Sequence, residues 1–310
     1  MTKIEHMRDL NESLEVFKQA LSEGTGTTYG SSYWAALADC EYKGAKVLEA
    51  NKRRLAMLEE KKEETEEEKE TDEEDLTNLY LGTEVHALLA LYHGLDPHFR
   101  ATPEKFLDLV SPEAQRLFQA YLVHDSDAPL RGHIEDLAGP ILTVDVELPL
   151  ENIVGGYHII GGYPYTTKLD LIYGCQNGTV IVDHKTRAQK LPDQPILRLQ
   201  HQTDPQFLGQ VYLAQQHETL KTGTLNPSSF TPPTTYHVWN AIIKTKKVKV
   251  ERHTIEVTPE MAANWDKHQT NLWKSVIALK NHSCVTPRRN PKACWRWNRP
   301  CTWLQECWKT

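Results

Sequence analysis

Three charged residues lie at the ends of two apolar segments, and their spacing suits phosphate chemistry. Asp170 lies in KLDLIYG, and Asp183 and Lys185 follow an apolar run in TVIVDHKT. Because side chains alternate along a strand, Asp183 and Lys185 point to one face and His184 points to the other. If the two segments pair as a hairpin, Asp170 approaches Asp183, since facing side chains across a strand pair are ~5 Å apart. We therefore expect a cluster of two acids and one lysine.

Two carboxylates and an ammonium group are suited to phosphodiester hydrolysis. Carboxylate oxygens are the ligands that hard divalent cations such as Mg²⁺ prefer. Such a cation stabilises charge on a phosphate and lowers the pKa of a bound water, while the ammonium group offsets transition-state charge. An Asp-x-Lys tripeptide often occurs by chance. The apolar strand before it is the stronger indication, because a charged pair beside buried positions is costly unless it has a role.

The surrounding segments predict the elements that must position this cluster. Their order, helical, then a β-meander, then alternating helix and strand, predicts an α/β or α+β core with a mixed β-sheet, flanking helices and an N-terminal helical part. Period-two alternation predicts strands over ILTVDVELPL, YHIIGGY, TTKLDLIYG, TVIVDHKT, TTYHVWNAIIK and KKVKVERHTIEV. Helical spacing and capping signals predict helices over 1–23, 31–50 (with Cys40 inside), 76–92, 103–122, 204–218 and 258–281.

Charge and length constrain the function without excluding a polyanionic partner. The net charge of −7 equals that of the acidic segment 61–75, which has ten acids and three bases, so the remainder is neutral and has basic stretches such as KTKKVKVER. A length of 310 residues allows one elaborated domain or two. We expect an N-terminal helix and linker (1–31) and one domain (32–310). No segment approaches the ~20 apolar residues of a membrane span, and the polar N-terminus predicts a cytoplasmic protein without membrane association.

The ordered set GTEVHALL, KLDLI, VIVDHKT and a helix with Gln and Tyr resembles the RecB-like branch of PD-(D/E)XK nucleases. That branch includes CRISPR-associated adaptation nucleases, helicase–nuclease subunits and phage exonucleases. The resemblance spans about 32–307 and implies a restriction-endonuclease-like core. It further implies that His86, Asp170 and Asp183 bind Mg²⁺ or Mn²⁺, that His184 contributes its backbone carbonyl, and that Lys185 is catalytic. A histidine ligand is more favourable for Mn²⁺ than for Mg²⁺, although a histidine on a buried helix usually has only a structural role.

The glutamine motif departs from the family pattern. The family's Gln-x-x-x-Tyr corresponds here to PQFLGQVYLAQ, in which Gln206 and Gln210 are one helical turn apart and Tyr212 follows Gln210 by two residues. The tyrosine is therefore not at the expected offset. We expect Gln210 or Gln206 beside the catalytic residues, with Tyr212 nearby, and the sequence does not choose between the two glutamines.

Four cysteines form a second candidate site. Cys294, Cys301 and Cys307 occur in KACWRWNRPCTWLQEC, and three thiols are one short of a four-ligand shell, for which Cys40 is a fourth candidate. This layout resembles that of iron–sulfur nucleases in the same branch, and the resemblance implies a [4Fe-4S] cluster that closes the C-terminal tail, 284–310. Zinc and unligated buried cysteines remain alternatives, because thiolates bind both metals.

The resemblance also implies a substrate and partners. These are DNA that is single-stranded or has free ends, cut exonucleolytically in repair, recombination or phage or CRISPR-type processing, with a helicase or recombinase as a partner. Basic residues and tryptophans in the tail would suit a DNA strand, and the same tryptophans are equally explained by packing around a cluster. Two rival hypotheses remain: a catalytically silent DNA-binding or assembly module with this fold, and a zinc-stabilised protein without a nucleic-acid role.

Overall fold

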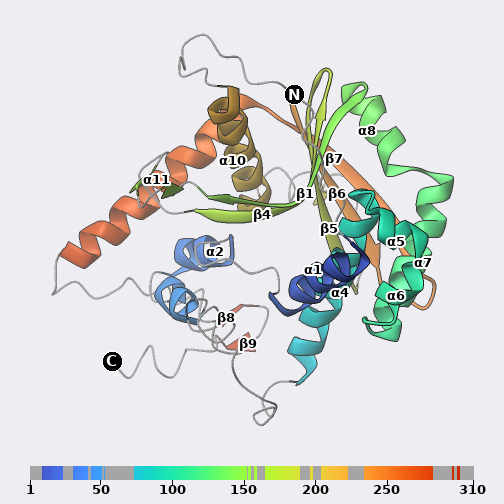
Figure 1. The fold of residues 1–310 in the computed structure, drawn as a ribbon. Coiled ribbons are helices and arrows are strands. Elements are labelled where there is room, and N and C mark those ends of the chain that lie inside the picture. The colour runs from blue at the N-terminus through green and yellow to red at the C-terminus, as the bar shows by residue number, and fades with distance from the viewer. Residues whose placement is uncertain are drawn as a thin grey trace.

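Helices cover both faces of one five-stranded sheet (Figure 1). A computed structural model describes residues 9–23, 31–40, 43–50, 52, 73–151, 153–154, 157–158, 165–188, 196–197, 204–222, 234–281, 295–296 and 299–300. The order of strands across the sheet is β1-β4-β5-β6-β7, and every neighbouring pair is antiparallel except β5 and β6. The bounds are β1 Ile141–Glu151, β4 Thr166–Cys175, β5 Gly178–Arg187, β6 Thr235–Ile243 and β7 Lys249–Val257.

The parallel pair of β5 and β6 follows from the helix between them. Helix α10, Pro205–Thr222, lies in the connection from β5 to β6. Parallel strands need such a crossover, whereas β4 and β5 are antiparallel and are joined by the short turn at Gln176 and Asn177. The sheet is thus mixed, and the predicted α/β class with flanking helices is confirmed.

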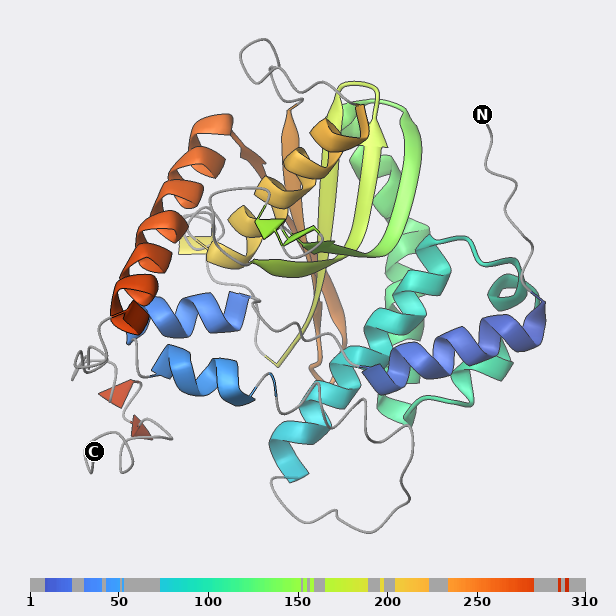
Figure 2. The same ribbon diagram turned by 60° about the vertical axis from the view of Figure 1, so that its left-hand side comes forward.

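Two sets of helices enclose the sheet (Figures 1 and 2). One side, which we call the α10 face, carries α10, α2 (Ser31–Asp39) and α11 (Pro259–Asn281). The opposite side, the α7 face, carries α4 (Glu73–His93), α7 (Pro112–Asp127) and α8 (Leu130–Ala138). Three further helices, α1 (Leu10–Glu23), α5 (Pro97–Ala101) and α6 (Pro103–Leu107), pack in the same helical part as α4 and α7. Alternation along β5 sorts its side chains between the two faces, since Ile181 packs with α10 residues whereas Val180 and Val182 pack with α8 residues.

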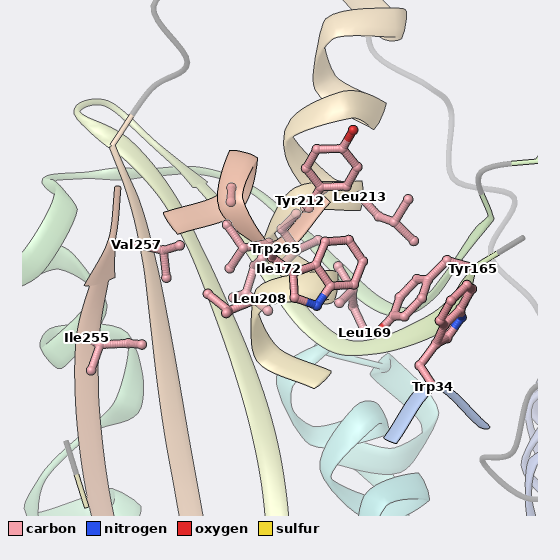
Figure 3. Close-up of a cluster of buried hydrophobic side chains, with 14 of the residues drawn as sticks. Trp34, Tyr165, Leu169, Ile172, Leu208, Tyr212, Leu213, Ile255, Val257 and Trp265 are labelled. Atoms are coloured by element: carbon pink, nitrogen blue, oxygen red, sulfur yellow. The ribbon is translucent and has the colours of Figure 1, made fainter. Parts of the chain in front are cut away.

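Aromatic rings fill the core on the α10 face (Figure 3). The Tyr165 ring lies edge-on to the Trp265 ring with 4.9 Å between centroids, and Trp34 of α2 lies 6.4 Å from Tyr165. Gly209 of α10 approaches these rings closely. A Cβ at this position would lie 2.8 Å from the Trp265 ring and would collide with the Tyr165 hydroxyl, so only glycine lets α10 pack at this depth.

Two sequence predictions for secondary structure were wrong. The helix predicted over 31–50 is interrupted, because α2 ends at Asp39, residue 40 is not helical, and the next helical residue that the structure describes is 43. A Cβ at Gly44 would lie 2.8 Å from Leu37 Cα, whereas residues seven apart in one helix are separated by ~10 Å. The chain therefore reverses, and buried Cys40 lies just after α2. The helix predicted over 103–122 is also interrupted, because residues 108–111 separate α6 from α7.

Two short ribbons lie outside the main sheet. Strand β3, Tyr157–His158, pairs with β2, Ile153–Val154, and the remainder of YHIIGGY lies outside the described residues. Strands β8, Trp295–Arg296, and β9, Arg299–Pro300, form the second ribbon. Cys294, Cys301 and Cys307 are outside the described residues, as are positions 61–72 of the acidic segment. Of the helices that the structure describes, none is both long and apolar enough to cross a membrane.

Candidate active site

Strands β4 and β5 separate at the two candidate acids. Their pairing runs from the turn to Leu171 and Val182 and stops there, although β5 continues along β6 to its end and β4 continues along β1. Asp170 and Asp183 are the next residues on either side of this fork. Beyond it, the His184 N–H donates to Asp170 Oδ2 at 2.7 Å. The Asp170 carboxylate thus accepts the hydrogen bond from β5 that a backbone carbonyl of β4 would accept if the two strands remained paired.

Asp183 has three hydrogen-bond donors around one carboxylate. Lys185 Nζ lies 2.9 Å from Asp183 Oδ2 and 3.1 Å from Oδ1. The amide groups of Gln206 and Gln210 donate to the same Oδ1 at 3.2 and 3.3 Å. The Asp183 side chain is 2 % exposed, whereas that of Lys185 is 30 % exposed. The structure therefore brings both candidate glutamines to Asp183, and the ammonium group lies nearest to solvent.

His237 fixes the orientation of Gln210. Its Nε2 lies 2.9 Å from Gln210 Oε1, and the Phe207 ring packs on its imidazole at 4.4 Å between centroids. With Oε1 accepting from the imidazole N–H, the Gln210 NH₂ must face Asp183. Tyr212 instead packs against the Trp265 ring in the core. It follows Gln210 by two positions, which corresponds to about 200° of rotation around the helix, so the two side chains point in nearly opposite directions. The expectation that Tyr212 lies near the site was wrong.

Helix α4 places His86 beside the other acid. His86 Nδ1 lies 3.4 Å from Asp170 Oδ1, and the two side chains are 14 % and 12 % exposed. The His86 ring also lies edge-on to the His184 ring at 6.2 Å between centroids. Helix α4 contacts β4 and β5, so it carries the histidine to the fork. The structure thus brings together His86, Asp170, Asp183 and Lys185 from three separate elements.

The two carboxylates differ in their electrostatics. Burial raises the pKa of Asp183, and the Asp170 charge adds to this effect while Lys185 opposes it. Burial would also raise the pKa of Asp170, but His86, His184 and Lys185 outweigh it and hold this pKa well below its usual range. For Lys185, burial is outweighed by Asp183 and Asp170, so its pKa is raised. Asp170 and Lys185 are therefore held in their charged forms, and the Lys185 ammonium group opposes the effect of burial on Asp183.

The donor atoms at the fork fit a hard divalent cation. Within the described ranges, no three His, Cys, Asp or Glu side chains converge as a ready metal-binding group. Mg²⁺ does not need one, since it is usually bound by one or two carboxylates together with water and substrate phosphate oxygens. Burial, together with the Asp170 charge, raises the pKa of Asp183, and a bound cation would oppose both effects.

The sequence analysis did not single out the polar residues behind the site. Asn240 on β6 is fully buried, and its Nδ2 lies 2.9 Å from His184 Nδ1. The sequence contains a signal for it, because Asn240 interrupts the apolar run VWNAII, and a buried amide requires hydrogen-bond partners. His237, three residues earlier on the same strand, faces the opposite side of the sheet and contacts Gln210.

Residues 44–307 match the family model described as the PD-(D/E)XK nuclease superfamily, and the chain belongs to this superfamily. Among solved structures, a candidate exonuclease from Eubacterium rectale is 13 % identical, with a TM-score of 0.44 and coverage of 99 % of this chain and 93 % of that one. The protein SSO0001 is 15 % identical, with a TM-score of 0.26 and coverage of 72 % and 82 %. No curated protein matches the chain.

Family membership confirms the superfamily part of the resemblance and indicates a nuclease. The iron–sulfur branch stays a prediction, because three of its four cysteines lie outside the described residues. Cys40 and Cys175, which the structure does describe, are both buried.

Proposed function

We propose that this protein is a metal-dependent deoxyribonuclease that hydrolyses phosphodiester bonds at Asp170, Asp183 and Lys185. The observation that carries the proposal is the fork between β4 and β5, at which the buried Asp183 carboxylate lies 2.9 Å from the Lys185 ammonium group and the partly buried Asp170 carboxylate lies beside it. Membership in a nuclease superfamily supports the reaction class. Water adds across the bond, one P–O bond breaks, and the products are a phosphate monoester and a hydroxyl group.

Asp170 and Asp183 would bind Mg²⁺ or Mn²⁺, with His86 and the backbone carbonyl of His184 as further ligands. The cation supplies charge stabilisation and a more acidic bound water when it is present. The support from the structure is the chemistry of the donor set, which consists of two desolvated carboxylates with an imidazole 3.4 Å from one of them.

The protein's own side chains perform the remaining tasks. Lys185, which is the most exposed group of the cluster, offsets negative charge on the phosphate as the nucleophile attacks. Asp183 holds the Lys185 ammonium group and keeps it protonated, since its charge is the main cause that raises the pKa of Lys185. Gln206 and Gln210 donate to Asp183 Oδ1 and thereby orient the carboxylate.

The proposed substrate is DNA that is single-stranded or has free ends, cut exonucleolytically in repair, recombination or phage or CRISPR-type processing. A helicase or recombinase would supply it. We also propose a cytoplasmic protein with one nuclease domain over 32–310 and a [4Fe-4S] cluster on Cys40, Cys294, Cys301 and Cys307. The resemblance of the sequence supports these details, and the burial of Cys40 is compatible with the cluster.

End-labelled single- and double-stranded oligonucleotides, incubated with Mg²⁺, Mn²⁺ or a chelator, test the proposal. We expect cleavage with either cation, none with chelator, and none in Asp183→Ala or Lys185→Ala proteins that retain the parent's circular dichroism. A circular single strand as a further substrate determines whether an end is required. Variants that cleave as fast as the parent would overturn the assignment of the site. DNA binding without hydrolysis under both metals would instead favour the catalytically silent module.

A further inference from the structure

A row of buried polar side chains crosses three strands directly behind the candidate site. His184, Asn240 and Arg252 are register partners on β5, β6 and β7, so their side chains lie next to one another. They project from the α7 face, whereas Asp183 projects from the α10 face. Asp125 of α7 ends the row through an ion pair with Arg252, in which the two side chains are 9 % and 10 % exposed. We call these four residues, His184, Asn240, Arg252 and Asp125, the polar row.

The hydrogen bonds of the polar row allow only one arrangement. Arg252 Nη2 lies 2.9 Å from Asp125 Oδ1, and Arg252 Nε donates to Asn240 Oδ1 at 3.2 Å. The Asn240 NH₂ must therefore face His184 Nδ1, which lies 2.9 Å away. His184 Nδ1 then accepts this bond, and the proton of the neutral ring is on Nε2. Arg252 thus sets the amide orientation of Asn240, and Asn240 sets the tautomer of His184.

Both ends of the polar row are anchored in the α7 face. Asp125 accepts hydrogen bonds from the Tyr92 hydroxyl at 3.0 Å and from the Leu130 N–H at 2.8 Å. The His184 ring stacks on the His93 ring at 5.6 Å between centroids and 19° between planes. Helices α4, α7 and α8 therefore fix the row from behind, and the row does not reach the α10 face.

The polar row supports the one segment of β5 that has lost a neighbour. Beyond Val182, β5 pairs with β6 but not with β4. The position of the Asp183–Lys185 segment thus depends on the β6 ladder, on the bond from His184 N–H to Asp170, and on the His184 side chain. Because His184 lies between the acid and the lysine, a shift of its backbone moves both reactive side chains at once.

We propose that Asn240, oriented by Arg252 and Asp125, is a positioning residue for the nuclease reaction, and this proposal rests on the proposed function. It acts through His184 and touches neither substrate nor metal. Replacing a residue that orients a metal ligand through a hydrogen bond typically alters activity by about 10- to 100-fold, although the residue does not contact the reacting atoms.

Asn240→Ala and Arg252→Lys test the role, and Thr254→Ala is the matched control. Thr254 lies on the same strand and face as Arg252, and its hydroxyl bonds to His133 at 3.0 Å instead of joining the row. The experiment measures kcat and KM on an end-labelled single strand with Mn²⁺. We expect Asn240→Ala to lower kcat by about 10- to 100-fold and to leave KM within about threefold. Arg252→Lys retains the charge, so a smaller loss follows, and Thr254→Ala keeps the parent's kcat.

A double variant separates action through His184 from general loss of stability. If Asn240 acts through His184, Asn240→Ala combined with His184→Ala loses no more kcat than the worse single variant. Long-range ¹⁵N–¹H spectra of the histidines add a readout independent of activity, with His184 as the Nε2–H tautomer in the parent and a changed signal in Arg252→Lys. If Asn240→Ala does not fold, the histidine spectrum of the parent and the kcat of Arg252→Lys still test the positioning role.

The outcomes separate the two proposals. A parent protein without cleavage overturns the proposed function, and this inference with it. An active parent in which Asn240→Ala has the same kcat as Thr254→Ala overturns the positioning role alone. Additive losses in the double variant, or an Nδ1–H tautomer of His184 in the parent, would also overturn it.

Discussion

Three consecutive residues of β5, Asp183, His184 and Lys185, place different polar groups on the two faces of the sheet. On the α10 face, Asp183 collects three donors on one oxygen, and Lys185 remains 30 % exposed. On the α7 face, His184 and Asn240 are 2 % and 0 % exposed and belong to an ordered row of hydrogen bonds. For the proposed reaction, the α10 face (the reactive face) must be accessible to substrate and carry charge. The α7 face (the supporting face) must instead exclude water from its hydrogen bonds. The alternation of side chains along a strand provides both.

The two faces also differ in the sign of the pKa shift that burial causes. On the α10 face burial raises the pKa of Asp183, so the folded state favours a bound proton there. On the α7 face burial lowers the pKa of His93 to about 4 and that of His184 well below its ordinary value, so both rings are neutral. Folding therefore makes Asp183 easier to protonate, and His93 and His184 harder to protonate, than in the unfolded chain.

The largest effect is expected from a substitution that removes the Asp170 charge but retains the hydrogen bond from the His184 N–H. Asp170→Asn retains an oxygen that accepts from the His184 N–H, so the fold should persist, but the cation loses one carboxylate. We expect cleavage with Mg²⁺ to fall by about 10³-fold. Glu256→Gln, the same change at an exposed position of β7, is the control. Parent-like cleavage by Asp170→Asn, with unchanged circular dichroism, would show that the reactive face is placed wrongly.

The second effect concerns stability on the α7 face. The pKa of His93 is lowered to about 4 by burial, against an ordinary value of 6.5. Its unfolded form therefore binds a proton first, and stability is lost as pH falls from about 6.5 towards 4. A single such group lowers the free energy of unfolding by about 2 kcal/mol between neutral pH and pH 5. Urea unfolding at pH 7, 6 and 5 measures it. His93→Gln should flatten this dependence, and an unchanged slope would contradict the prediction.

The smallest effect compares the two glutamines on the reactive face. Gln210 is 1 % exposed and is oriented by His237, whereas Gln206 is partly exposed, so water can replace its contact. We expect Gln210→Ala to lower kcat by about 10-fold and Gln206→Ala by about twofold. Steady-state cleavage of one oligonucleotide measures both. If Gln206→Ala lowers kcat as much as Gln210→Ala or more, burial does not determine which glutamine contributes more to the rate.

Local sequence patterns were sufficient to predict which side chains gather at the candidate site. The alternation in VIVDHKT places Asp183 and Lys185 on one side, and the short turn before it brings Asp170 close. The helical turn between Gln206 and Gln210 likewise places both near one carboxylate. These arrangements depend on short-range periodicity, which the sequence displays directly.

The supporting face depends on long-range pairing, which a single sequence does not display. His184 meets Asn240 only because β6 is parallel to β5 in that register, and Arg252 joins through β7. The partner of Arg252, Asp125, comes from α7, more than a hundred residues earlier in the chain. Nothing local to these residues predicts their contacts, although an amide within the apolar strand VWNAII was a visible anomaly.

Gly209 links the positions of the two glutamines to the packing of the α10 face. Helix α10 carries both glutamines, and its depth is set where Gly209 meets Tyr165 and Trp265. A methyl group there would lift the helix and draw both amide groups away from Asp183. In related proteins, a substitution at the position of Gly209 could therefore abolish the proposed activity even if every residue of the candidate site stayed the same. Inspection of the site residues alone would not reveal that loss.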